Sequence, residues 1–554
     1  MQTSIPVIDL FAGPGGLGEG FASFRRDGSR RPPFKIRLSV EKDPYAHQTL
    51  ELRSFYRQFV YLDVPEEYYQ YLRGQLTRTE LFERYPHQAK AAREEARLAE
   101  LGTQDNENIN RWIEERLSKC SSKNWVLIGG PPCQAYSVIG RSRMRSGDPE
   151  KFDKDHRHFL YREYLRIIAG FRPSVFVMEN VTGILSATVG SEHIFERILS
   201  DLKQPVAALL EHNDPGQVSI IGDATDNQLE YHVYSLVAGK NAEDKCKPTE
   251  FIIKAEDYGI PQARHRVILL GVRKDLQAAP NGLTRYESPV TAGSVLRDLP
   301  KLRSRLSRQE DNDEDWRKVI RSLTDHPWYA ALAQNNNNLF IKDLACSVER
   351  AANTMPAGLP IGGEFVPCSI KSFYRPDWFH DPRLGGICNH TARAHMGEDL
   401  HRYLFASCFA KTYGYSPTIA DFPEALRPKH KNINAAISAD HFDDRFRVQI
   451  EERPATTIVS HMAKDGHYTI HYDPLQCRSM TVREAARLQT FPDNYFFEGS
   501  RTQQYKQVGN AVPPLLASQI AGLVYNLMEV IHGAQRRQHS PVPQSSSGLV
   551  ADKS

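Results

Sequence analysis

The chain has 554 residues, of which 40% are hydrophobic and 25% charged, an ordinary globular composition with material for about two to four domains. Its net charge of +3 does not by itself argue for nucleic-acid binding. No run reaches the ~20 apolar residues of a membrane span, the start lacks a charged leader, and the eight cysteines include no C-x-x-C pair. We therefore expect a cytoplasmic protein with no membrane contact, disulfide scaffold or bound metal.

A glycine-rich turn between a strand and a helix is the first chemical feature. Ile5–Leu10 predicts a buried strand and Glu19–Phe24 a helix. The turn between them, FAGPGGLG, lets the backbone approach a ligand, and the helix start favours polar or negative groups. Its spacing departs from the dinucleotide fingerprint, so the turn alone is weak evidence.

Two acidic residues follow predicted strands. Ile36–Glu41 predicts a second strand whose terminal acid suits the two hydroxyl groups of a ribose, although a plain surface acid is the alternative. Phe59–Leu62 predicts a third strand, and Asp63 after it would face an adenine ring. Residues 65–123 are rich in Glu, Arg, Lys and Ala, with helical spacing over Glu80–Leu101. We interpret them as a helical insertion between the third and fourth strands.

Cys133 stands at the centre of the sequence pattern. The apolar run Trp125–Ile128 predicts a strand, and Gly-Gly-Pro-Pro then leads directly to Cys133. Ligands gather at that edge of an open α/β sheet, and a thiolate there is a candidate nucleophile. A buried structural cysteine is the common alternative. The two glycines and two prolines before Cys133 fix a backbone shape rather than fill a core, which favours the functional interpretation. The polar stretch Gln134–His156 predicts a loop that closes over a substrate.

Further elements follow the cysteine loop. Hydrophobic runs predict a helix over Phe159–Ala169 and strands over Ser174–Met178, Val233–Leu236, Phe251–Ile253 and Val267–Val272, with the second and third of these strands paired. Glu179 follows the first of these strands, and Arg264 and Arg266 precede the last. Because the arginines alternate with His265, we expect them to share a face.

The second half of the chain is less regular. Asn281–Val448 shows no clear period and predicts a separate, irregular domain. An amphipathic helix is predicted over Leu515–His532 and stopped by Gly533. Residues 534–554 are rich in Ser, Pro and Gln and predict a disordered tail.

Seven separated motifs resemble those of the DNA (cytosine-5) methyltransferases of bacterial restriction-modification type. In the family's order they are DLFAGPGG at Asp9–Gly16, GGPPCQAYS at Gly129–Ser137, ENV at Glu179–Val181, QARHR at Gln262–Arg266, RPATTI at Arg453–Ile458, TVREAARLQTFPD at Thr481–Asp493 and QVGNAVPP at Gln507–Pro514. One motif alone is fallible, but seven in order are strong evidence.

The resemblance implies a Rossmann-like α/β methyltransferase fold with a mostly parallel sheet. It assigns residues 1–280 to the catalytic domain, 281–448 to a target recognition domain, and 449–533 to a segment that returns to the catalytic domain. The region 65–123 departs from the family pattern and leaves the chemistry intact, although it could carry a partner or DNA contact.

The resemblance also implies the chemistry. Cys133 would add to carbon 6 of a cytosine, and Glu179 would share a proton with ring nitrogen 3. Arg266 would hold the cytosine carbonyl and Arg264 the acidic or sulfur side. The alternatives are a turn-capping acid for Glu179 and surface salt bridges for the arginines. Because a duplex hides carbon 6, the base must flip out, and Gln134, Ser137 and Arg157 are candidate loop or phosphate contacts.

The implied methyl donor is S-adenosylmethionine. Its candidate binding residues are Phe11, Ala12, Gly13, Gly15, Gly16, Leu17, Glu41, Asp63, Pro131, Asn510 and Val512. The implied partner is double-stranded DNA, with a cognate restriction endonuclease acting separately, and we expect a monomer.

Three other functions remain open from the sequence. A transfer RNA cytosine-5 methyltransferase would use the same chemistry, but the large middle domain suits reading of duplex DNA better. A non-catalytic DNA-binding relative is disfavoured because Cys133, Glu179 and both arginines are present. A nicotinamide oxidoreductase has little support beyond the glycine turn.

Overall fold

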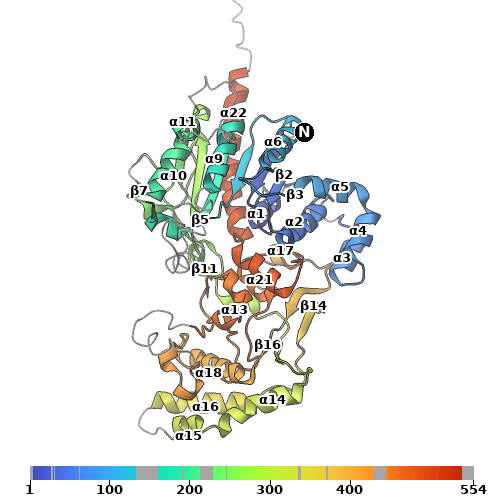
Figure 1. Cartoon of the computed structure of the whole chain (residues 1–554), viewed down its shortest axis with the longest axis vertical. Helices are drawn as coiled ribbons and strands as arrows, with labels where there is room; N and C mark the ends of the chain where they lie inside the picture. The colour runs from blue at the N-terminus through green and yellow to red at the C-terminus, as the bar shows by residue number, and fades with distance from the viewer. Residues whose placement is uncertain are drawn as a thin grey trace, which may run out of the picture.

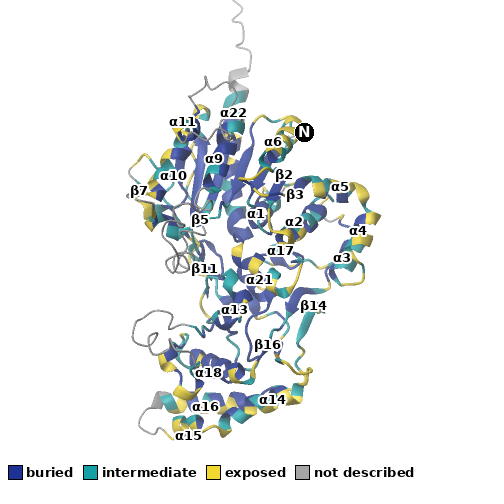
Figure 2. Cartoon of the chain, viewed as in Figure 1, coloured by how far each residue is buried: buried dark blue, intermediate teal, exposed yellow. Residues whose placement is uncertain are grey.

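The computed structural model describes residues 4–26, 29, 31–60, 63–132, 160–189, 192–211, 229–244, 246–334, 339–369, 372–428 and 445–539. Figure 1 shows an upper lobe built around a sheet and a lower lobe of helices, with a central region between them. Buried residues run through the sheet of the upper lobe and continue into the central region (Figure 2). Cys133, Gln134, Ser137 and Arg157 lie outside the described residues.

A nine-stranded sheet organises the upper lobe. Its order is β3 (Ala96–Leu98), β2 (Phe34–Glu41), β1 (Ile5–Leu10), β4 (Val126–Gly129), β5 (Val175–Val181), β12 (His265–Arg273), β8 (Tyr231–Ser235) and β9 (Lys240–Asn241), with β10 (Ile252–Lys254) paired to β12. The first five strands are parallel, and β12 runs antiparallel to both of its neighbours. The predicted α/β fold with a mostly parallel sheet is therefore confirmed.

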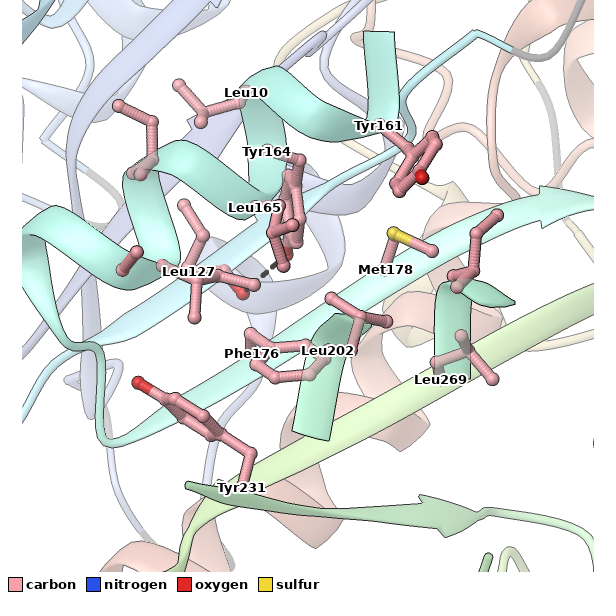
Figure 3. Packing of buried hydrophobic residues seen from close by; sticks show 14 of the residues in the cluster. Leu10, Leu127, Tyr161, Tyr164, Leu165, Phe176, Met178, Leu202, Tyr231 and Leu269 are labelled. Carbon is pink, nitrogen blue, oxygen red and sulfur yellow. Dashed lines mark hydrogen bonds between the residues drawn. The ribbon is translucent and has the colours of Figure 1, made fainter. Parts of the chain in front are cut away.

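Helices cover both faces of this sheet, which explains its apolar strands. One face packs against α6 (Asn106–Ser118), α9 (Leu160–Phe171), α10 (Ile194–Lys203) and α11 (Pro205–Glu211). The other packs against α1 (Gly16–Ser23) and α22 (Pro514–His539). On the first face, Tyr164 of α9 is buried against the strands, and its hydroxyl donates to the Leu127 carbonyl of β4 at 3.3 Å (Figure 3).

The contact between α1 and α22 leaves no room for a side chain at Gly20. A Cβ there would lie 2.3 Å from the Cβ of Ala517 and 2.6 Å from the Pro514 carbonyl oxygen. We expect Gly20→Ala to lower the free energy of unfolding by about 1–3 kcal/mol because it overpacks this contact. Urea unfolding should measure this, with Gly533→Ala as the control, since nothing lies within 4 Å of that Cβ. Equal stability of the two variants would contradict the prediction.

The prediction of the third strand is wrong. Phe59 and Val60, its described residues, follow α2 (Pro44–Arg57) and form no strand. The third strand is β3, and it lies where a helix over Glu80–Leu101 was expected. Ala, Arg and Leu favour helices locally, so only pairing with β2 makes this segment extended.

Residues 65–123 are consequently divided by a strand rather than inserted as one unit. Three helices precede β3: α3 (Glu66–Leu72), α4 (Arg78–Arg84) and α5 (Pro86–Glu95). Only α6 lies between β3 and β4. We call α3, α4 and α5 the insertion helices.

Two other expectations are corrected. The strands predicted at Val233–Leu236 and Phe251–Ile253 do not pair with each other, because both pair with β12 on the edge opposite β5, β10 along its start and β8 along its end. Gly533 does not stop the last helix, since α22 continues to His539.

The segment Arg501–Gln535 contains a window apolar enough for a membrane span, but 61% of that window is buried inside the protein.

The middle region is not irregular, contrary to expectation. Its lower lobe contains α14 (Asp313–Arg321), α15 (Pro327–Ala333), α16 (Leu339–Asn353) and α18 (Gly397–Tyr413), packed around one apolar core. Above it, β14 (Gly362–Pro367) pairs with β15 (Gly386–Thr391), and β15 contacts α20 (Val482–Leu488). The helix α21 (Arg501–Asn510) packs against α20. α14 and α15 are short, of 9 and 7 residues, and a long connection separates α16 from α18, so the sequence shows no sustained helical period.

Candidate active site

The carboxyl ends of β4 and β5 bring Glu179 against the backbone at Gly130, three residues before Cys133. A Cβ built on Gly130 would lie 3.1 Å from Oε2 of Glu179, so the carboxylate closely approaches this backbone. Asn180 also donates from Nδ2 to the carbonyl of Pro131 at 3.3 Å. Pro131 is buried, and the described chain ends at Pro132, one residue before Cys133.

Arg266 pairs with Glu179. Because β12 runs antiparallel to β5, residues from the end of β5 lie beside the start of β12. The Nε of Arg266 lies 2.9 Å from Oε1 of Glu179, and the two side chains are 16% and 14% exposed. A glycine backbone, a carboxylate and a guanidinium therefore meet at one partly buried point, which can hold a polar planar ring.

Arg264 has a different environment from Arg266. Its guanidinium is buried and donates to the carbonyls of Ile458, at 2.9 Å, and Gly509, at 3.3 Å. Burial lowers the pKa of Arg264, and the nearby charge of Arg266 lowers it further. Arg264 thus holds two C-terminal segments in place behind the site, while Arg266 faces Glu179.

Gln262, like Arg264, holds separate C-terminal segments together, a role that the sequence did not indicate. Its amide nitrogen donates to the Leu488 carbonyl, and its amide oxygen accepts from the Ile458 backbone at 2.7 Å. The QARHR motif therefore connects the catalytic sheet to the RPATTI, TVREAARLQTFPD and QVGNAVPP motifs.

The glycine-rich turn forms a cradle beside Glu41. Phe11, Gly13 and Gly15 all have positive φ angles, of 55°, 57° and 96°. The Gly13 N–H donates to Oε2 of Glu41 at 2.7 Å, and the Asp43 N–H donates to Oε1 at 2.8 Å. Burial raises the pKa of Glu41. Nothing lies within 4 Å of a Cβ built on Gly13, so there is space above the turn.

The C-terminal segment closes one side of this cradle. A Cβ on Gly16 would lie 2.3 Å from the Val512 carbonyl oxygen, so these backbones touch. Leu17 and Val512 are buried in one core cluster, Ala12 is also buried, and Asn510 is exposed at the end of α21. These predicted residues therefore surround the turn, with only some side chains facing outward.

Asp63 does not stand at the end of a strand, where it was predicted. It is exposed, and it follows α2 rather than a strand. The neighbouring strand end belongs to β3, where Leu98 is 52% exposed. Just beyond it, Glu100 pairs with Lys42 at 2.9 Å, next to Glu41. Leu98 and Glu100 were missed because their strand was predicted as a helix.

Asp9 is a second residue whose position only the structure reveals. It is fully buried beneath the turn, and burial raises its pKa to about 8. A Cβ on Gly18 would lie 2.8 Å from Oδ2 of Asp9, so this glycine admits the carboxyl group. The Tyr495 hydroxyl donates to the Pro14 carbonyl and secures the turn from the other side.

Known proteins resemble this chain over nearly its full length. The sequence profile of the family described as C-5 cytosine-specific DNA methylase matches residues 102–205 and 206–526. The type II methyltransferase M.Bpa9945I of Bacillus paralicheniformis is 34% identical over 546 residues, covering 95% of this chain and 100% of that protein.

Two more distant relatives carry related descriptions. The type II methyltransferase M.AgeI of Thalassovita gelatinovora is 25% identical, covering 93% of this chain and 98% of that protein. The DNA (cytosine-5-)-methyltransferase M.ApeKI of Aeropyrum pernix is 24% identical, covering 73% of this chain and 82% of that protein.

Proposed function

The chain belongs to the C-5 cytosine-specific DNA methylase family and is a DNA cytosine-5 methyltransferase, and we propose that it acts through a covalent Cys133 adduct on a flipped cytosine. The observation that carries this proposal is the Glu179–Arg266 pair against Gly130, at the start of the loop that contains Cys133. A cytosine ring held there would meet a carboxyl group, a guanidinium and the chain that leads to the thiol.

The proposed reaction has three steps. The Cys133 thiolate adds to carbon 6, while the Glu179 carboxyl shares its proton with ring nitrogen 3 and limits the charge on the ring. Carbon 5, now part of an enamine, forms a bond to the methyl group as the methyl–sulfur bond of the donor breaks. Water then takes the proton from carbon 5, the electron pair of that C–H bond expels the Cys133 thiolate and restores the ring double bond, and ring nitrogen 3 returns its proton to Glu179.

Arg266 and Arg264 divide the supporting roles. Arg266 orients Glu179 through the 2.9 Å contact between Nε and Oε1 and is available to the cytosine carbonyl. Arg264, held by the carbonyls of Ile458 and Gly509, keeps the strand that carries Arg266 in register with the C-terminal motifs. We propose that Gln134, Ser137 and Arg157, which lie outside the described residues, contact the DNA backbone.

The residues around the glycine turn fit S-adenosylmethionine, the donor that family membership implies. Bound there, it supplies an electrophilic methyl group on a sulfonium. Glu41 would accept hydrogen bonds from the ribose hydroxyls, and the backbone of Phe11–Leu17 would line the open space at Gly13. Pro131, Asn510 and Val512 would complete the pocket, with Leu98 and Glu100 taking the place first assigned to Asp63.

Glu41→Gln should test this cofactor site. Glutamine has one acceptor oxygen instead of two, so we expect the KM for S-adenosylmethionine to rise about tenfold with kcat little changed. Steady-state kinetics at saturating DNA measure both parameters. Asp63→Asn is the matched control, because Asp63 is exposed and follows α2 rather than a strand of the cradle. A larger rise in KM for Asp63→Asn than for Glu41→Gln would contradict the assignment.

Family membership implies a DNA substrate, and we extend this to the biological setting. We propose a cytoplasmic monomer that methylates a short duplex sequence read by residues 281–448. A cognate restriction endonuclease acting separately on the same sequence fits the type II relatives.

Mapping methylated cytosines in a host that lacks cytosine-5 methylation would test the activity. Wild-type protein should modify one short motif, and Cys133→Ala should modify none. Folded wild-type protein that modifies no motif in the host genome would overturn the proposal, and transfer RNA would then be the next substrate to test.

A further inference from the structure

A chain of polar contacts connects the cofactor turn to the segment that leads into β15. Glu19, one helical turn after Gly15, accepts from Arg53 of α2, with Arg53 Nε 2.9 Å from Oε2. Arg53 Nη1 donates to Asn494 at 3.1 Å. Asn494 donates to Oδ2 of Asp381 at 2.7 Å.

Asp381 is the point where the insertion helices join this chain. Oδ2 of Asp381 also accepts from the Tyr69 hydroxyl of α3 at 2.8 Å, and Oδ1 accepts from the Arg383 backbone at 3.1 Å. One carboxylate therefore holds together three parts of the sequence that are separated by 312 and 113 positions. Asp381 belongs to the segment between α17 (Pro376–Phe379) and β15, which continues into the lower lobe.

The insertion helices reinforce the same segment. Arg73 donates from Nε to the Leu384 carbonyl at 3.1 Å, and the Arg383 guanidinium lies 4.6 Å from the ring centroid of Tyr69. Leu384 and Cys388 are buried in one apolar cluster with residues of the insertion helices. This face of the insertion is therefore occupied within the chain, which opposes its use as a partner-binding surface.

The inner part of the polar chain is too buried for a simple test. Glu19 and Arg53 have side chains that are 1% and 7% exposed, and the Arg53 charge holds the pKa of Glu19 down at about 2. Removing either charge would leave the other buried without a partner and destabilise the fold. Tyr69 and Asp381, at the outer end, can be changed with less damage.

We propose that Asp381 is a positioning residue through which the insertion helices hold the β15 segment against α1 and α2, so that DNA held by the lower lobe meets the cofactor turn in register. This rests on the proposed function of residues 281–448 as the DNA-reading part. Asp381 touches no reacting atom, so its loss should weaken DNA binding alike in the ground and transition states.

Steady-state kinetics of Asp381→Ala, Asp381→Asn and Tyr69→Phe would test this. At saturating S-adenosylmethionine, we expect Asp381→Ala to raise the KM for DNA about tenfold with kcat changed less than about threefold. Asparagine keeps one acceptor oxygen for Tyr69 and Asn494 and loses only the acceptor for the Arg383 N–H, so Asp381→Asn should raise the KM by about threefold, less than Asp381→Ala does. Asp275→Ala is the matched control, since Asp275 is exposed outside residues 281–448 and pairs only with Arg273 among the ion pairs of the described residues.

The outcomes separate this inference from the proposed function. A wild type that methylates DNA, with Asp381→Ala and Tyr69→Phe showing the wild-type KM, would overturn the positioning role alone. Equal defects in Asp381→Ala and Asp381→Asn would also overturn it. If Asp381→Ala does not fold, Tyr69→Phe decides, because a KM for DNA raised about threefold is then the expected result for the loss of one hydrogen bond. A wild type that does not methylate DNA would instead refute the proposed function.

Discussion

Cys133→Ala is expected to reduce methyl transfer to duplex DNA below detection, because without the thiolate carbon 5 of cytosine is too weak a nucleophile to attack the donor. Transfer of labelled methyl groups to a duplex carrying the mapped motif measures this. Cys246→Ala is the matched control, since Cys246 is a free, partly buried cysteine between β9 and β10, outside residues 281–448. It should retain the wild-type rate.

A covalent trap gives an independent reading of the same step. A cytosine that carries fluorine on carbon 5 has no proton to lose there, so the Cys133 adduct cannot resolve after methyl transfer. Wild-type protein should therefore form a stable complex with fluorinated duplex that survives denaturation, and Cys133→Ala should not. A stable complex with Cys133→Ala would show that another residue is the nucleophile.

Glu179→Gln is expected to lower kcat by about 10²- to 10⁴-fold, the usual contribution of a positioned proton donor. Glutamine keeps the size of the side chain and can still hydrogen-bond Arg266, but it has no acidic proton to share with ring nitrogen 3. The KM for DNA should change much less than kcat. Single-turnover rates at saturating DNA and cofactor measure the effect.

Glu256→Gln is the matched control for Glu179→Gln. Glu256 is also a partly buried carboxylate that pairs with β12, through His265 Nε2 at 2.7 Å. It lies away from Gly130, so its change should leave kcat within about threefold of the wild type. A Glu179→Gln enzyme that is as active as Glu256→Gln would show that Glu179 only caps its strand.

The local chemistry was readable from the sequence. β1 has the predicted limits, Ile5 and Leu10, and the predicted strand before Cys133 differs from β4 by one residue. The family and the α/β fold followed from motifs in order. Such features are readable because side-chain chemistry, strand composition and glycine turns are properties of short stretches of chain.

The tertiary structure alone decided which strands pair and which side chains the site residues contact. Nothing near Ala96–Leu98 distinguishes a strand from a helix, and only β2 beside it decides, which moved the adenine-side candidates from Asp63 to Leu98 and Glu100. Arg264 and Arg266 look alike in sequence, yet one binds the Gly509 carbonyl 245 positions away and the other pairs with Glu179. Contacts of this kind join segments far apart in the chain, so no local sequence pattern could predict them.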